Sequence, residues 1–293
     1  MDYSGFRALH PLPCFVYFLG AMLLSMLLLH PGFLIVSTGL LLVLSYRLKG
    51  HEGGLLNIGW MLLFGLVLFA LNPLFSHRGE HILFYLWEQP ITLESVVYGL
   101  TLSLSTLSLI VTFQCYSKVI TADKFLYLFA SVWPKGSLVT VMGMRFVPLL
   151  KARLRTIGQV QQTKGISLTE GRLAKRAGDG MKLLQILLTW SLEDALQTAD
   201  SMKARGFGLK SRSTYKTYRM RSRDWRALGL IIVPLLICIL GRWTGGYGLL
   251  VIYPSLEFTR MSWGDWLYFA VFVFYLGIPW LWEGKELLWR YSK

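Results

Sequence analysis

Six apolar runs, each close to the length of a membrane-spanning helix, dominate this sequence. They cover residues 12–29, 33–48, 55–71, 93–116, 227–243 and 266–282. A helix needs about 20 mostly apolar residues to cross the hydrocarbon core of a bilayer. Only 16% of the residues are charged, whereas a soluble domain carries about 25%. We therefore expect an all-α membrane protein with about six transmembrane helices.

Turn signals separate these runs. His30-Pro31-Gly32 divides the first two, because a proline inside a helix breaks it. A seventh apolar stretch, 125–144, is cut by Trp133-Pro134-Lys135-Gly136 into pieces of about ten residues, each too short to cross. We expect a short interfacial helix over 123–132 instead of a further crossing.

Positive charge is concentrated in one segment. Residues 145–226 hold eighteen Lys and Arg and six Asp and Glu, so that the other 211 residues share a net charge of only +2. Because Lys and Arg concentrate on the cytoplasmic side of membrane proteins, we place this segment in the cytoplasm. Six crossings of the plasma membrane then leave both termini inside and the loops 73–92 and 244–265 outside. No base-stacking or DNA-reading motif accompanies the charge, so we expect no nucleic-acid partner.

The chain is thus divided into three predicted parts. Residues 1–122 hold four transmembrane helices, 123–226 form a cytosolic and interfacial part, and 227–293 hold the last two transmembrane helices. The middle part contains two amphipathic helices, over 145–164 and from Met181 to Arg205, in which apolar residues recur at helical spacing. Pro148 fits best near a helix start or at a kink. The apolar stripe of the second helix either packs between the two helices or forms a surface for a partner; it comprises Leu184, Leu187, Leu188, Trp190, Ala195, Ala199 and Met202.

The end of the second amphipathic helix is the most informative motif. Ala204-Arg205-Gly206 places an arginine on the last turn, where a cation complements the helix dipole, and a glycine where the helix stops. The small neighbours let another backbone approach, and the guanidinium can bind a carboxylate with two hydrogen bonds. An ordinary helix stop with a solvated arginine is the alternative.

Other chemistry has little support in the sequence. His77, Glu80 and His81 have a spacing that suits a metal on a helix, but Gly79 and the loop setting favour solvated residues, so we predict no metal site. No Gly-x4-Gly-Lys-Ser/Thr segment is present, so we expect this chain to hydrolyse no ATP itself. Acidic residues are nearly absent from the spans, whereas an ion-driven carrier would need them.

The sequence resembles the transmembrane T component of energy-coupling factor (ECF) transporters, the EcfT/CbiQ family. The resemblance rests on the segment from Ser191-Leu192-Glu193 to Ala204-Arg205-Gly206, on Met144-Arg145-Phe146-Val147-Pro148, and on the two His-Pro pairs around the first apolar run. In place of the family's first Ala-Arg-Gly motif the chain has Thr163-Lys164-Gly165. The glycine and the positive charge are kept, but lysine lacks the planar guanidinium with which arginine binds a carboxylate through two hydrogen bonds.

The resemblance implies a non-catalytic subunit of an ATP-driven importer of vitamins or metal ions. Its partners would be two cytosolic ABC-type ATPases, which bind the ATP, and a membrane S component, which binds the substrate. It implies that Arg205 docks in one ATPase and Lys164 in the other, and that the chain itself binds no cofactor. An integral-membrane enzyme acting on a lipid or isoprenoid phosphate, a conventional permease and a membrane scaffold are the alternatives.

Overall fold

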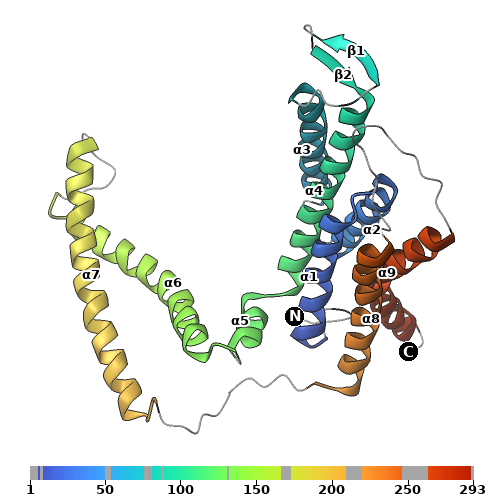
Figure 1. Cartoon of the computed structure of the whole chain (residues 1–293). Coiled ribbons are helices and arrows are strands. Elements are labelled where there is room, and N and C mark those ends of the chain that lie inside the picture. Colours follow the sequence, from blue (N-terminus) through green and yellow to red (C-terminus); the bar gives the residue numbers. More distant parts are fainter. Residues whose placement is uncertain are drawn as a thin grey trace. The chain divides into compact units, whose positions relative to one another are not determined.

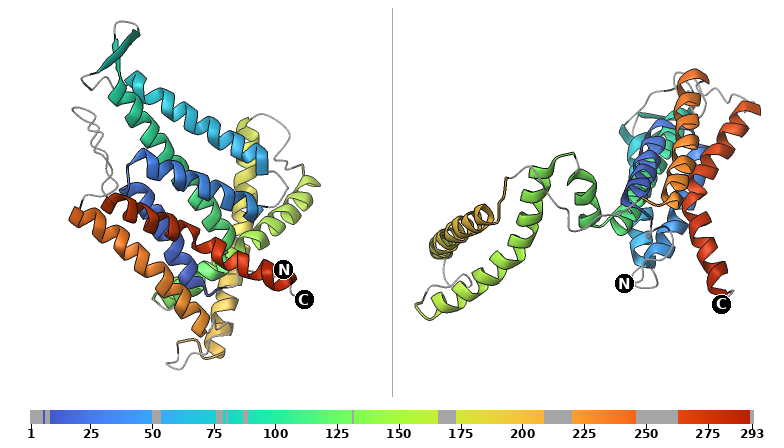
Figure 2. Two further views of the ribbon diagram at one scale, coloured as in Figure 1. Left: turned by 90° about the vertical axis from the view of Figure 1, so that its right-hand side faces the viewer. Right: turned by 90° about the horizontal axis from the view of Figure 1, so that it is seen from below.

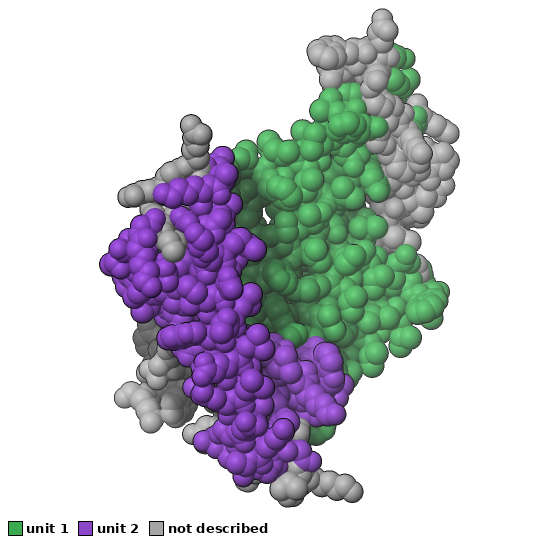
Figure 3. Space-filling view, turned by 90° about the vertical axis from the view of Figure 1, so that its left-hand side faces the viewer, with its two compact units in different colours: residues 1–125, 218–293 green, residues 126–217 purple. Residues whose placement is uncertain are grey.

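In the computed structural model, the described residues form helices and one small β-hairpin (Figure 1). It describes residues 6, 9–49, 54–75, 79, 81–86, 89–130, 132–165, 173–208, 220–245 and 263–291. The chain divides into two compact units, which Figure 3 distinguishes by colour. Unit 1 comprises residues 1–125 and 218–293, and unit 2 comprises residues 126–217, so that unit 2 is an insertion in unit 1.

The six predicted apolar runs are all helices of unit 1. They are α1 (Pro11–Leu27), α2 (Pro31–Lys49), α3 (Gly54–Phe75), α4 (Leu93–Val119), α8 (Ser222–Gly245) and α9 (Trp263–Tyr291). Helix α4 packs against α1, α2 and α3, while α8 packs against α1 and α9, and α9 also contacts α2 (Figures 1 and 2). The result is a bundle in which α1 contacts both α4 and α8.

The His-Pro pairs are helix caps. Pro11 and Pro31 are the first residues of α1 and α2, where the fixed φ of proline suits a helix and its missing N–H costs nothing. The Nδ1 atom of His10 accepts a hydrogen bond from the backbone N–H of Leu12 at 3.2 Å. The Nδ1 atom of His30 accepts one from Gly32 at 3.2 Å. The signal that separates the first two runs is therefore a cap for the second helix.

Four helices in the described part of the chain are long and apolar enough to cross a membrane. These segments are Pro31–Leu48, Leu93–Val119, Ser222–Gly245 and Trp263–Trp282. The other two predicted spans contain the shorter apolar helices Pro11–Leu27 and Gly59–Phe75. The prediction of an all-α membrane protein is confirmed.

Unit 1 is polar at several points inside and apolar outside. The hydroxyl of Ser108 on α4 lies 3.0 Å from that of Ser25 on α1 and 2.9 Å from that of Ser37 on α2. All three side chains are buried. Large apolar side chains point outward, among them Trp60, Leu62, Phe64 and Leu66 on α3 and Val233, Leu236 and Leu240 on α8. Interhelical hydroxyl contacts together with an apolar exterior are typical of helices packed within lipid.

One element of unit 1 was not expected from the sequence. Strands β1 (Ile82–Leu86) and β2 (Gln89–Thr92) form an antiparallel hairpin inside the predicted loop 73–92. The β1 segment is rich in bulky apolar residues, which favour strands, but five residues are too few for a clear alternating pattern. Most of the second predicted outer loop, 246–262, lies outside the described residues.

Unit 2 is built mainly from two long helices. Helix α5 (Ala122–Ala130), which confirms the short helix predicted over 123–132, begins in unit 1 and ends in unit 2, and α6 (Pro134–Gln162) then begins at Pro134. Helix α7 (Leu173–Ala204) follows. Both long helices start earlier than predicted. Pro148 therefore lies inside α6 and not near its start, and α7 includes Gly178 and Gly180 although each glycine costs about 1 kcal/mol relative to alanine.

Candidate functional site

Arg205 lies directly after Ala204, the last residue of α7. The backbone N–H of Arg205 donates to the carbonyl of Ser201 at 3.1 Å. Phe207 N–H then donates to Met202 and Gly206 N–H to Lys203, each at 2.9 Å. Gly206 has a φ of +78°. This pair of bonds, with glycine in the left-handed region, is the Schellman motif, which satisfies the last carbonyls and stops the helix.

The end of α6 has a similar construction. The N–H groups of Lys164 and Gly165 donate to the carbonyls of Gln161 and Gln162, each at 3.0 Å. The Thr163 hydroxyl donates to the carbonyl of Val160 at 2.7 Å, and Gly165 has a φ of +75°. Each helix thus ends in a cation followed directly by a glycine with positive φ. We call residues 163–165 the α6 tip and residues 204–206 the α7 tip.

Both cations at the tips are accessible. Lys164 and Arg205 are exposed. Among the residues that the structure describes, three ion pairs form, and neither cation belongs to one of them. Each tip carries a negative helix end that the cation complements. An exposed cation beside small residues is suited to enter an acidic or carbonyl-lined groove of another protein.

Helices α6 and α7 are fastened to each other along one side. Arg153 of α6 forms an ion pair with Asp194 of α7, and its guanidinium lies over the ring of Trp190, 5.7 Å from the centroid. Ile157 and Leu183 are buried. Beside this contact lies a groove of about 350 Å³ with a mostly apolar lining that includes Thr156, Val160, Gln161 and Ile186. The sequence analysis missed the ion pair, because opposite charges on two helices do not reveal which residues face each other.

The residues that line the groove also show that the α6 tip and the α7 tip lie apart. Val160 and Gln161, in the last turn of α6, line it together with Ile186 and Trp190, near the middle of α7. Fifteen further residues, fourteen of them in α7, lead from Trp190 to Arg205, a helical distance of about 22 Å. Figure 1 shows α7 continuing beyond its contact with α6. The structure therefore presents Lys164 and Arg205 as two separate points on one unit.

The apolar stripe of α7 is for the most part not core. Leu184, Leu188 and Trp190 are 47%, 61% and 52% exposed, and Ala195 and Ala199 are exposed as well. Packing between the two helices uses Leu183 instead. Leu192 and Leu196 are each 65% exposed, so that leucines at positions 184, 188, 192 and 196 form a row at a spacing of four on one face of the helix. We call this row the leucine face.

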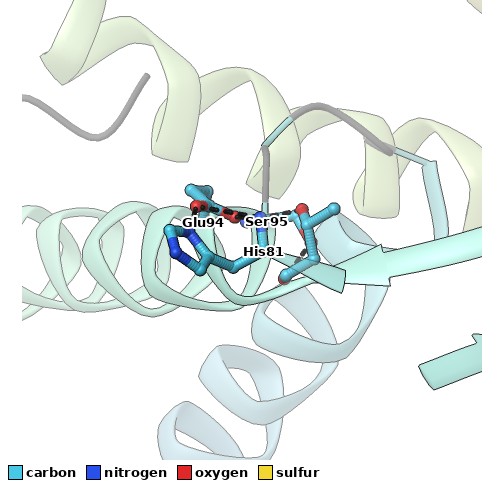
Figure 4. Close-up of polar contacts among 4 residues, drawn as sticks. His81, Glu94 and Ser95 are labelled. Carbon is cyan, nitrogen blue, oxygen red and sulfur yellow. Dashed lines mark hydrogen bonds and ion pairs between the residues drawn. The ribbon is translucent and has the colours of Figure 1, made fainter. Parts of the chain in front are cut away.

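The candidate metal residues separate into two groups. His77 and Glu80 lie outside the described residues. His81 Nδ1 lies 2.8 Å from Oε1 of Glu94, whose side chain is completely buried at the start of α4 (Figure 4). The backbone N–H of His81 also lies 3.3 Å from both carboxylate oxygens. Within the described ranges no group of three His, Cys, Asp or Glu side chains comes together. The pair ties the hairpin to α4.

Comparison with known protein families shows to which family this chain belongs. A family model described as CbiQ, cobalt transport protein, matches residues 6–216. The chain belongs to the CbiQ family. The matched range contains α1 to α7 and both tips, and α8 and α9 follow it.

Relatives of this CbiQ protein carry a consistent name. The energy-coupling factor transporter transmembrane protein EcfT of Lactococcus lactis is 25% identical over 224 residues, which cover 69% of this chain and 82% of the relative. The EcfT of Lactobacillus helveticus is 27% identical over 191 residues, 61% of this chain and 67% of the relative. That of Lacticaseibacillus paracasei is 32% identical over 106 residues, 35% and 40% of the two chains. The recognition made from the sequence is confirmed, and the chain is a multi-pass membrane protein.

Proposed function

We propose that this chain is the energy-coupling membrane subunit of an ATP-driven importer. The observation that carries the proposal is the pair of matching tips: each long helix of unit 2 ends in an exposed cation followed by a glycine with positive φ. Membership of the CbiQ family and similarity to EcfT proteins supply the class of transporter. The cargo is a vitamin or a metal ion bound by a separate S component.

In this proposal the two tips enter two cytosolic ATPases. Arg205 docks in one and Lys164 in the other, with Ala204, Gly206, Thr163 and Gly165 giving close backbone approach. ATP binds to and is hydrolysed by those partners, and this chain binds no cofactor. Arg205 lies about 22 Å along the helix from Trp190, which lines the groove beside the end of α6, and tips separated in this way suit two separate partner subunits. The leucine face provides an apolar surface for the S component, since exposed apolar patches mark interaction sites.

The orientation follows from charge. Residues 145–226 carry most of the net charge of the chain, and such segments stay on the cytoplasmic side. The tips then face the compartment that holds ATP. Six crossings place both termini in the cytoplasm as well.

The test is purification of the tagged chain from its native membrane, with identification of the proteins bound to it. We expect two nucleotide-binding subunits and a small hydrophobic protein. Arg205→Glu and Lys164→Glu should each weaken binding of an ATPase by about 10- to 150-fold, because each removes charge-assisted hydrogen bonds and adds repulsion. Arg155→Glu is the control, since Arg155 is an exposed cation in the interior of α6. Equal loss in all three variants, or no ATPase bound to the wild-type chain, would contradict the proposal.

A further inference from the structure

The chain crosses between the two units twice, and a buried charged residue of unit 1 lies close in sequence to each crossing point. The chain passes from unit 1 to unit 2 after Phe125 and returns at Tyr218. Lys124 is the residue before Phe125 and is 5% exposed. Asp224 follows shortly after the return and is 4% exposed. Buried charges are rare because their desolvation is costly, so each needs specific partners.

Lys124 is bonded to the end of α4. Its Nζ atom donates to the carbonyl oxygen of Val119, the last residue of that helix, at 3.2 Å. The carbonyls at a helix C-terminus carry the negative end of the helix dipole, so an ammonium group there is favourable. Lys124, close to the point where the chain enters unit 2, is thus hydrogen-bonded to α4, which packs against α1, α2 and α3.

Asp224 is bonded to the starts of two helices. Its Oδ2 atom accepts a hydrogen bond at 3.0 Å from the N–H of Arg221, directly before α8, as the acidic residue of a capping box does. Its Oδ1 atom accepts one at 3.2 Å from the N–H of His10, the N-cap of α1. A carboxylate between two helix N-termini meets two positive dipole ends. Asp224 thus joins the start of α8 to the start of α1.

We propose that Lys124 and Asp224 are positioning residues that make the helix ends of unit 1 follow the two connections when unit 2 moves. This inference rests on the proposed function, in which nucleotide binding by the partners moves unit 2. Each side chain pairs with backbone groups at helix ends of unit 1, and an apolar replacement would leave those groups without this bond. Without these three hydrogen bonds, motion would be absorbed in the connections before it reached α4, α8 and α1.

The experiment measures a distance inside unit 1 as a function of nucleotide. Spin labels are attached at Ser117→Cys, on the last turn of α4, and at Trp225→Cys, at the start of α8; both positions are exposed. The native cysteines Cys14, Cys115 and Cys238 are buried, so labelling is selective. The complete co-purified complex is measured with ADP and with a non-hydrolysable ATP analogue.

The wild-type complex should show a nucleotide-dependent shift of the distance between the labels. Lys124→Met and Asp224→Asn should each reduce this shift by about twofold or more, in the range by which single residues modulate coupling, while nucleotide still binds. Asp224→Asn keeps the shape of the side chain but retains only one acceptor oxygen. Lys118→Met is the matched control, because Lys118 is an exposed lysine on the same last turn of α4.

The outcomes separate this inference from the proposed function. Absence of ATPases from the wild-type preparation would contradict the proposed function itself. With ATPases bound, a full shift in both variants, or no shift in the wild-type complex, would overturn the inference alone. If Lys124→Met and Asp224→Asn were both missing from the membrane while Lys118→Met was recovered normally, the two side chains would be needed for folding. That result would also overturn the inference.

Discussion

The hydroxyl of Tyr275 on α9 donates a hydrogen bond to the backbone carbonyl of Tyr17 on α1, 2.7 Å away. Tyr17 in turn donates to the carbonyl of Leu276 at 3.0 Å, and the two rings stack with centroids 5.3 Å apart. Both side chains are completely buried. This reciprocal pair joins the first and last helices of unit 1, and polar contacts of this kind give membrane helices a defined register.

The pair requires a glycine beside it. A Cβ atom on Gly20 would lie 2.3 Å from the Tyr275 hydroxyl and 2.8 Å from a methyl of Leu235. We expect Gly20→Ala to destabilise unit 1 by about 1–3 kcal/mol through overpacking, seen as a lower melting temperature in detergent. Gly39→Ala is the control, since no atom lies within 4 Å of the Cβ position there. Equal melting temperatures of the two variants would contradict the close packing.

The α7 tip depends on the backbone of Gly206. Its φ of +78° is unfavourable for residues with a Cβ, so Gly206→Ala should cost about 1–2 kcal/mol locally. We expect faster amide hydrogen exchange at Gly206 and Phe207, and weaker ATPase binding, without loss of the rest of α7. Gly158→Ala, inside α6 and with open space at the Cβ position, should instead stabilise its helix by about 1 kcal/mol. Unchanged exchange in Gly206→Ala would show that the tip needs no glycine.

The Arg153–Asp194 pair can be tested by charge reversal. Arg153→Glu should loosen the contact of α6 with α7 and increase proteolysis of unit 2, and Arg153→Glu combined with Asp194→Arg should restore part of the loss. The expected coupling energy is about 0.2–1 kcal/mol, because the pair is partly solvated. Lys151→Glu, at an exposed position of α6, is the control. It reverses a charge without removing this ion pair, so comparable proteolysis there would argue against our assignment.

Stability should depend on pH through His30. Burial lowers the pKa of its imidazole, and the negative charge of Asp265 opposes this only partly. A lowered pKa means that the folded state favours neutral His30, whose Nδ1 accepts the N–H of Gly32. The stabilisation is complete above the ordinary pKa of 6.5 and is lost as the pH falls through the lowered value of the folded state.

The measurement compares melting temperatures of the wild-type chain and His30→Asn at about pH 7.5 and pH 5. Asparagine keeps an acceptor at the cap but does not titrate. The wild-type chain should lose more stability on acidification than the variant. A larger loss in His30→Asn would mean that protonated His30 is preferred in the fold, which is the opposite sign.

Much of the fold follows from local sequence signals. Apolar length predicted the six helices of unit 1, and Trp133-Pro134 predicted the break at which α5 ends. Arg205-Gly206 predicted the end of α7, because only glycine readily adopts the backbone found there. These signals act within a few residues and do not depend on the rest of the chain.

What sequence reasoning missed depends on contacts between distant residues. The partner of Asp224 is the backbone of His10, 214 residues away, and no pattern in the sequence records such a bond. The sequence could not show whether the apolar stripe of α7 is core or exposed. An amphipathic pattern is the same whether its apolar side packs against another helix or binds a partner protein. The hairpin and the early start of α7 show that boundaries without a proline or a cap are poorly defined by sequence.

The leucine face has a consequence for the life of the protein in the cell. The four leucines of this face on α7 are each 47–65% exposed. A copy of the chain without partners therefore presents an exposed apolar surface, which promotes aggregation and recognition by cellular quality control. In the proposed function, a copy made in excess over its partner subunits would therefore be short-lived. The amount of the complex would then be set by whichever partner subunit is scarcest, with no separate regulator needed.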